Sequence, residues 1–520
     1  MANGSKEHLT INIKDEKLGY DNPALEPQPN QMKFRKISTI QQPPAYVENG
    51  KVHPDQANNI ANYNKSYADN ALRSVYVTTP NTLKPPKLPD KDYEPFDNRE
   101  VKHPTTYWET LIHMLKASLG TGILAMPDAF HNAGYVVATI GTLVIGFLCT
   151  YTIHILINSE YELCRRKKQP SMTYPETAEA AVQEGPKALR GISRGVPILC
   201  NAFLLLYQIG SCCIYVVFIS SNIKDVVDYY YKSNYGTESF DIRYYMLIFL
   251  LPLILINWVR NLKYLAPLST AANIVTLVSF AIIFFYMFSD IPDIHGREAV
   301  APFKNMPLFF GTVLFAMEAI GVVMPLENEM KEPRRFGSAF GVLNCAMLPI
   351  TLLYTFVGFF GYLKYGAHVK GSITLSLPPA DILAQSARVM LAFAIFITHS
   401  IACYVAVDIT WRQYIEPVVM KGKIYWEYLV RTVLVFITFI LAVAIPDLEL
   451  FISLIGALCL STMGLSFPAL IQLFTFWYEY EGVQFVLFFL KNLTIILIAC
   501  LGFIVGTYTS VEAIIQKFFA

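Results

Sequence analysis

The sequence has few charged residues, and neither sign predominates. Asp, Glu, Lys and Arg together make up 16% of the 520 residues, and the formal net charge is +1. A soluble globular domain carries about 25% of such residues. The composition therefore excludes an ordinary soluble domain, and a net charge this close to zero gives no reason to expect a nucleic-acid partner.

The motifs of common catalytic and metal sites are also missing. There is no CxxC, HExxH, phosphate-binding loop or GxSxG, so the sequence offers neither a recognisable nucleophile nor a set of metal ligands. The nine cysteines suggest no disulfide framework, and eight of them fall within apolar segments. We therefore expect that the protein is not an enzyme and that it uses no metal and no cofactor.

Apolar residues, in contrast, are abundant. Hydrophobic residues make up 54% of the chain and aromatic residues 14%. From Tyr107 onward, apolar stretches long enough to cross about 30 Å of hydrocarbon recur between short polar breaks. We expect an all-α polytopic membrane protein with about eleven transmembrane helices. Their approximate bounds are 107–131, 135–159, 197–222, 244–260, 264–289, 306–327, 338–363, 382–408, 424–444, 449–471 and 484–508.

The loops between these segments differ in their basic residues. Positive residues mark the cytoplasmic loops of membrane proteins, and here they gather in alternate loops. These residues are Arg165, Arg166, Lys167, Lys168, Lys187, Arg190, Arg194, Arg260, Lys263, Lys331, Arg334, Arg335, Arg412, Lys421 and Lys423. The pattern predicts a cytosolic N-terminus and, with eleven segments, a short extracytosolic C-terminal tail at 510–520.

Residues 1–106 differ in composition from the membrane domain, which we place at 107–509. They are rich in Pro, Asn, Lys and Asp and contain no apolar core of a signal peptide. Such a segment buries too little apolar surface to fold alone. We expect a disordered cytosolic tail. Within it, Pro43, Pro44 and Tyr46 form a PPxY motif of the kind that WW domains bind, although four residues also match by chance.

The first apolar segment contains the sequence GTGILAMP at 120–127. Gly120 and Gly122 flank Thr121, and Pro127 follows, so we expect the helix to break near the middle of the bilayer. Unpaired backbone groups at that depth are tolerated where they line an enclosed cavity. The free N–H groups of a half-helix suit a carboxylate. Alternatively, the small residues only allow close packing of another helix.

The sixth segment contains a second unusual stretch, GTVLFAMEAIGVVMPLENEMK at 311–331. Glu318 lies deep in this apolar run, and Gly321 and Pro325 follow it. An ionisable group at such a depth marks a functional site by default, although it could instead be a structural carboxyl. The two interruptions lie five segments apart, which is the spacing of two inverted repeats that each open on a broken helix.

Several motifs in order make the family recognisable. The stretch TLIHMLKASL runs into GTGILAMP, and YQIGSCCIYVVFISSNIK and GSITLSLP accompany the sixth-segment motif. Together they resemble the amino acid/auxin permease superfamily, and within it the proton-coupled amino acid transporters, in particular the insect branch called pathetic-like. The resemblance implies eleven helices in a 5+5 inverted repeat of the leucine-transporter type plus one helix. It also implies proton-driven symport at the plasma membrane or the lysosome.

The resemblance assigns roles to residues of both interruptions. His113 matches a first-segment histidine implicated in proton coupling, and Glu318 is the second residue that we expect on the path of the proton. We expect the substrate carboxylate on the backbone of Gly120, Thr121, Gly122 and Ile123. We expect its ammonium group on carbonyls near Glu318, Ala319, Ile320 and Gly321.

The coupling ion and the degree of transport remain open. Small neutral amino acids are the usual substrates of the family, with protons as the coupling ion. Unwound carbonyls also suit sodium, so a sodium-coupled transporter is one alternative. An amino acid sensor with little flux is the other.

Overall fold

The computed structural model describes residues 93–101, 104–118, 120–237, 239–260, 262–317 and 320–518, without the side chains at 262, 263, 266 and 320. Within these ranges the chain is helical, and its one β-type pairing is an isolated bridge between Thr105 and Met330. The expected all-α class is confirmed. The predicted WW-binding residues Pro43, Pro44 and Tyr46, and also Glu318 and Ala319, lie outside the described residues.

Nine helices in the described ranges are long and apolar enough to cross a membrane. The interrupted pair α2 and α3 and the shorter apolar helix α7 bring the number of segments to the expected eleven. In chain order the helices are α2 (Tyr107–Ser118), α3 (Thr121–Ala133), α4 (Tyr135–Lys167), α5 (Tyr174–Glu184), α6 (Val196–Tyr235), α7 (Ile242–Asn257), α8 (Leu262–Phe288), α9 (Met306–Ala316), α10 (Ile320–Asn328), α11 (Val342–Tyr365), α12 (Ile373–Ser376), α13 (Ile382–Val407), α14 (Lys423–Ala444), α15 (Leu448–Ile455), α16 (Phe467–Thr475), α17 (Gly482–Leu501) and α18 (Thr507–Phe518).

Two helices extend well beyond the apolar runs that identify them. Helix α6 has 40 residues and ends where Gly236 adopts a left-handed conformation, φ 73°. The last segment passes from α17 through a π-helical turn, Gly502–Gly506, into α18, which ends at Phe518. Hydropathy detects only the part of a helix that lies in lipid. Polar contacts such as the Lys224–Asp228 ion pair support the remaining turns of α6.

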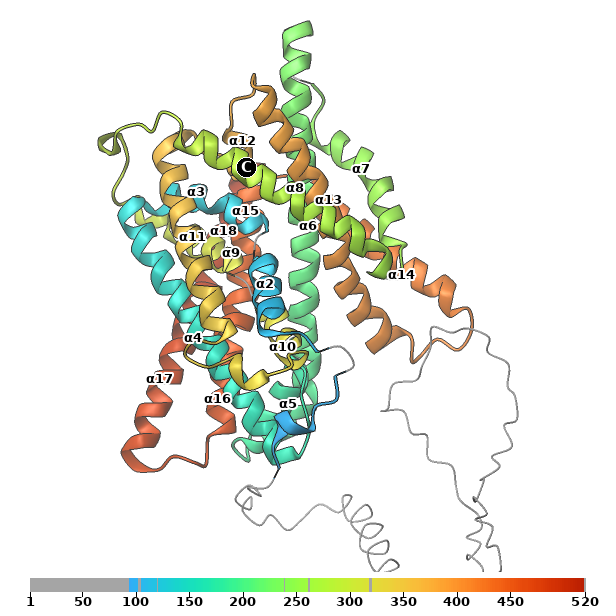
Figure 1. The fold of residues 1–520 in the computed structure, drawn as a ribbon, viewed down its shortest axis with the longest axis vertical. Coiled ribbons are helices and arrows are strands. Elements are labelled where there is room, and N and C mark those ends of the chain that lie inside the picture. The colour runs from blue at the N-terminus through green and yellow to red at the C-terminus, as the bar shows by residue number, and fades with distance from the viewer. Residues whose placement is uncertain are drawn as a thin grey trace, which may run out of the picture. The chain divides into compact units, whose positions relative to one another are not determined.

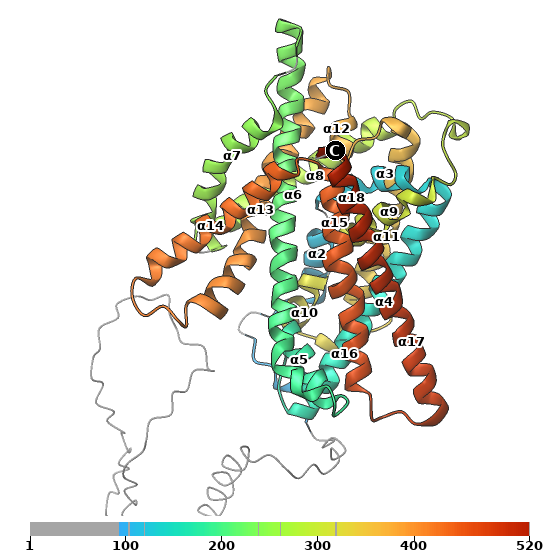
Figure 2. The ribbon, with the colours of Figure 1, turned by 180° about the vertical axis from the view of Figure 1, so that it is seen from behind.

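The helices form two groups on either side of α6. Helices α7 and α14 pack together on one side, and α4 and α17 lie on the other (Figures 1 and 2). Helix α13 packs along both α6 and α8, whereas α3 packs between α9 and α11. We call the end of the bundle at α5 the α5 end and the opposite end, at α12, the α12 end (Figure 1). The interrupted helices α2–α3 and α9–α10 connect the two ends.

The outer faces of the bundle are apolar. On α17, the side chains of Leu487, Leu490 and Leu497 are 64%, 49% and 60% exposed. Soluble proteins rarely expose contiguous apolar surface of this kind. Lipid covers it in a membrane, so the exposed leucines agree with the membrane class predicted from composition.

Candidate functional site

The first interruption lies where the glycine-rich motif predicts it. Helix α2 ends at Ser118, and α3 begins at Thr121 after Gly120, whose backbone is extended at φ −119° and ψ −154°. Thr121 and Ile123 are almost completely buried, at 3% and 0% exposure. The first N–H groups of α3 have no partners within the helix because they begin it, so this interruption places free donors inside the protein.

The second interruption lies in the sixth membrane segment. Helix α9 ends at Ala316, Met317 follows as its C-cap, and α10 begins at Ile320. Ala316 and Met317 are buried, whereas Gly321 is exposed. The last carbonyl groups of α9 lack helical partners. Glu318 and Ala319 belong to the part of this break that the structure does not describe, and their roles stay predictions.

The two interruptions meet in space. A Cβ atom at Gly122 would lie 2.6 Å from the Cα of Ala316 and 3.1 Å from its Cβ. Only glycine therefore fits at this position without a shift of the backbone. Helices α3 and α9 approach so closely here that the N-terminal end of one lies against the C-terminal end of the other. Their partial charges are of opposite sign, positive at α3 and negative at α9.

Helix α11 borders both interruptions, a feature that the sequence did not reveal. The hydroxyl of Tyr354, which is completely buried, donates to the carbonyl of Ser118 at the end of α2. One turn earlier on α11, the hydroxyl of Thr351 lies 3.8 Å from the sulfur of Met317. The carbonyl of Ser118 therefore accepts from Tyr354 as well as from the N–H of Gly120. One helix thus contacts residues at both breaks.

Two histidines of the membrane domain, His113 and His399, have opposite surroundings. His113 is exposed on α2, as is Lys116 one turn later. Its imidazole thus lies on the surface of the bundle and not between the interruptions. His399, in the eighth segment, is completely buried, and its Nδ1 lies 3.3 Å from the side-chain amide of Asn257. Among the described residues, no hydrogen bond links the side chain of either histidine to Gly122 or Ala316.

A cluster at the α5 end is a buried charged site that sequence reasoning missed. Arg99 precedes α2, and its Nη1 lies 3.0 Å from Oε1 of Glu327, at the end of α10. Its Nη2 lies 3.8 Å from Oε1 of Glu160, on α4. The side chains of Arg99, Glu327 and Glu160 are 5%, 3% and 2% exposed, respectively. We call these residues the Arg99 triad. Arg99 belongs to the segment predicted as a disordered tail, where a single arginine carries no signal of burial.

A second buried arginine lies at the α12 end. Arg388 of α13 is completely buried, and it donates to the carbonyls of Thr374 and Leu377 at 3.0 and 2.6 Å. Its Nη2 also lies 3.3 Å from Oδ2 of Asp225 on α6. The arginine therefore holds the segment around α12 against α6 and α13. Leu377 also lines a cavity of about 360 Å³ at this end, beside Tyr365.

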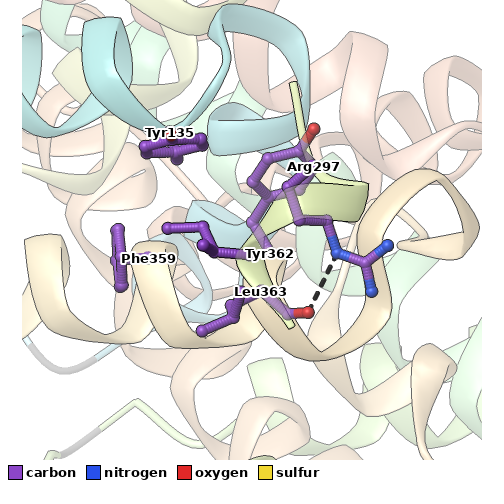
Figure 3. Close-up of a pocket in the computed structure, with 6 residues that line it drawn as sticks. Tyr135, Arg297, Phe359, Tyr362 and Leu363 are labelled. Carbon is purple, nitrogen blue, oxygen red and sulfur yellow. Dashed lines mark hydrogen bonds between the residues drawn. The ribbon is translucent and has the colours of Figure 1, made fainter. Parts of the chain in front are cut away.

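The loop at 289–305 covers part of the α12 end. Arg297 donates through Nε to the carbonyl of Leu363 at 2.9 Å, beside Tyr135 and Phe359, whose rings lie 6.1 Å apart at 87° (Figure 3). The same loop pairs with the turn between α3 and α4. Gly134 has φ +80° there, and a Cβ atom on it would lie 2.7 Å from the carbonyl oxygen of Ala299.

Comparison with known proteins gives a consistent result. Residues 103–512 match the family described as transmembrane amino acid transporter protein. The chain is 40% identical over 432 residues to the proton-coupled amino acid transporter-like protein pathetic of Drosophila melanogaster, across 83% of this chain and 90% of that protein. It is 26% identical over 425 residues to the probable amino acid transporter skat-1 of Caenorhabditis elegans, across 78% and 90%.

Among solved structures, the chain is similar to an inward-facing conformation of Mhp1. The TM-score is 0.47 and the sequence identity 14%, across 85% of this chain and 94% of that one.

Proposed function

Because this chain belongs to the transmembrane amino acid transporter family, we propose that it carries small neutral amino acids across a membrane together with protons. The family assignment confirms the resemblance seen in the sequence motifs. The relatives are described as transporters, in agreement with the expectation that the protein is not an enzyme. The substrate class and the coupling ion are our proposal.

The observation that supports a zwitterionic substrate is the contact of Gly122 with Ala316. The start of α3 offers N–H donors and a positive partial charge, whereas the end of α9 offers carbonyls and a negative one. An amino acid carries a carboxylate and an ammonium group one carbon apart, so both of its ends find a partner where the helices meet. We place the carboxylate on Gly120, Thr121, Gly122 and Ile123. We place the ammonium group on the carbonyls that end α9 and on those of Glu318, Ala319, Ile320 and Gly321.

A small substrate follows from the same contact. The backbones of α3 and α9 approach so closely at Gly122 that little space separates them. Tyr354 and Thr351 occupy the side of α11 that faces the breaks. A short side chain therefore suits the site better than a long one.

For proton coupling we propose Glu318 and His113. Glu318 lies in the sixth segment between the ends of α9 and α10, where a carboxyl group is costly in lipid unless it is protonated or paired. Histidine is the side chain that changes charge near neutral pH, and the exposed position of His113 gives it access to protons from outside the bundle. Both residues would then exchange protons during the cycle.

We further propose a cytosolic N-terminus and residence in the plasma membrane or the lysosomal membrane. The basic loops support the orientation. A WW-domain protein is the proposed partner of Pro43, Pro44 and Tyr46.

Uptake by purified protein in lipid vesicles tests the coupling ion. We expect accumulation of a small neutral amino acid when the outside is acidified, with or without sodium. Glu318→Gln keeps the shape of the side chain but removes its proton exchange, so we expect it to flatten the pH dependence of uptake. Strict dependence on sodium would favour the sodium-coupled alternative. Substrate binding without measurable flux would favour the sensor.

A further inference from the structure

The Arg99 triad joins the parts of both interrupted helices that lie toward the α5 end. Glu327 belongs to α10, and Arg99 lies eight residues before the start of α2 at Tyr107. Between Arg99 and α2, Thr105 pairs with the chain just after α10, because its N–H donates to Glu329 and its carbonyl accepts from Lys331. The segment before α2 is therefore attached to the end of α10 at two points, Arg99 and Thr105.

The formal charges in the triad do not balance. One guanidinium faces two carboxylates, and all three side chains are at least nine-tenths buried. Glu160 also accepts hydrogen bonds from the thiol of Cys164 and the N–H of Met172, each at 3.1 Å. The phenol of Tyr93, near Cys164, is the other titratable group at the site, and burial raises its pKa, so it stays neutral.

The guanidinium of Arg99 lies between the two carboxyl groups but does not bond equally to both. Within the described ranges, Nη2 of Arg99 is buried and makes no hydrogen bond, although Oε1 of Glu160 lies only 3.8 Å away. With both carboxyls ionised, the site would carry one net negative charge out of contact with water. Two carboxylates that share a buried site cannot both ionise without a large cost.

We propose that one of the two carboxyl groups, Glu160 or Glu327, carries a proton while Arg99 covers them. When Arg99 withdraws, this proton is released to water. The covered form then contains one guanidinium, one carboxylate and one neutral carboxyl. In the open form water solvates both carboxylates, and the proton leaves. The covered form binds one proton more than the open form, so acid favours covering and alkali favours opening.

This inference rests on the proposed function in one respect. If the protein couples amino acid transport to protons, the triad is a proton site that opens and closes with the α5 end. It is distinct from Glu318 and His113, and it needs no contact with the substrate. The triad can be tested without transport, because Cys164 reports on it directly.

Cys164 is completely buried, and its thiol donates to Glu160, so we expect a reagent to reach it only when the triad opens. We would label the purified full-length protein with a maleimide and measure modification of the Cys164 peptide by mass spectrometry. Glu327→Gln removes the excess negative charge, so covering no longer requires a proton. Below the pKa of the thiol, the thiolate fraction rises by the same factor per pH unit in both proteins, so we compare them there through the ratio of the wild-type rate to the Glu327→Gln rate. We expect this ratio to rise by up to about tenfold per pH unit, because opening releases one proton.

Two further variants make the outcome decisive. Glu160→Gln should behave like Glu327→Gln, so either variant can be used if the other folds poorly. Arg334→Gln removes an arginine at the same end whose partners Asp97 and Glu94 are partly exposed, and it should leave the rising ratio unchanged. A ratio that stays constant with pH for both glutamine variants would overturn the proposal. If the ratio rises with pH but acidification drives no uptake, the proposed function is wrong and the proposal for the triad stands.

Discussion

The two ends of the bundle each bury an arginine, but they neutralise it differently. Both arginines donate to two backbone carbonyls, but Arg99 at the α5 end faces two carboxylates, whereas Arg388 at the α12 end faces one. The first site changes its charge when a proton binds. The charge of the second is balanced by Asp225, and its hydrogen bonds go to backbone carbonyls, which do not titrate. We therefore expect pH to act on the Arg99 site more than on the Arg388 site.

The largest effect that we expect comes from Arg388→Leu. The substitution leaves the carbonyls of Thr374 and Leu377 without these donors, and it leaves Asp225 with the exposed Lys370 in place of a buried partner. Breaking a buried pair in this way costs about 3–5 kcal/mol. Thermal unfolding of the purified protein should show the loss at every pH tested. Arg412→Leu is the control, because its ion pair with Asp408 is exposed and its loss should change stability little. A strong pH dependence of the Arg388→Leu effect would remove the contrast between the ends.

Arg99→Gln should follow, with a loss of about 1.5–3 kcal/mol from its charged hydrogen bonds. Here the loss should depend on pH. Without Arg99 the buried carboxyls of Glu160 and Glu327 repel each other when ionised, and acid removes that repulsion. Stability of the variant relative to the wild type should therefore recover as the pH falls. Unfolding midpoints measured across the acid range check this, and an equal loss at all pH values would contradict it.

Between the two ends, Gly122→Ala tests the contact of the interruptions. The added Cβ meets the backbone of Ala316 at 2.6 Å, whereas a Cβ at Gly120 meets no atom within 4 Å. Overpacking costs about 1–3 kcal/mol and should separate α3 from α9. We expect amino acid uptake by Gly122→Ala to fall about tenfold, since this corresponds to about 1.4 kcal/mol, and Gly120→Ala to retain more of it. Equal activity in the two variants would argue against a site at this contact.

The smallest effect concerns Glu479, at the surface of the α5 end. Burial raises the pKa of this carboxyl, while Arg166 opposes the rise. A raised pKa means that the folded state favours the protonated form, so its contribution weakens as the pH rises through that pKa. Because the side chain is 45% exposed, Glu479→Gln should change stability by less than about 1 kcal/mol near neutral pH. A loss as large as that of Arg99→Gln would show that surface pairs, and not the triad, hold this end.

The sequence predicted the features that arise locally. Apolar runs identified eleven segments, and glycine with threonine and proline located the interruption between Ser118 and Thr121. These signals lie within one or two helical turns, so a single sequence contains them. The extent of α6 was missed because hydropathy falls where the helix leaves the lipid.

The interactions between distant residues could not be predicted in the same way. Arg99 and Glu327 are separated by 228 positions, and Tyr354 and Ser118 by 236. Nothing near Arg99 distinguishes it from the other basic residues of a polar segment. Tyr354 is one aromatic residue among many in α11. Their roles depend on which helices pack together, and one sequence does not contain that information.

The length of α6 has a practical consequence. Its 40 residues correspond to about 60 Å of helix at 1.5 Å per residue, about twice the hydrocarbon thickness of a bilayer. One end of this helix therefore rises above the α12 end as a stiff rod (Figures 1 and 2). In electron microscopy, small membrane proteins are hard to align because detergent hides their features. This rod would remain visible outside the micelle, and an antibody fragment raised against its tip would fix the viewing direction of each particle.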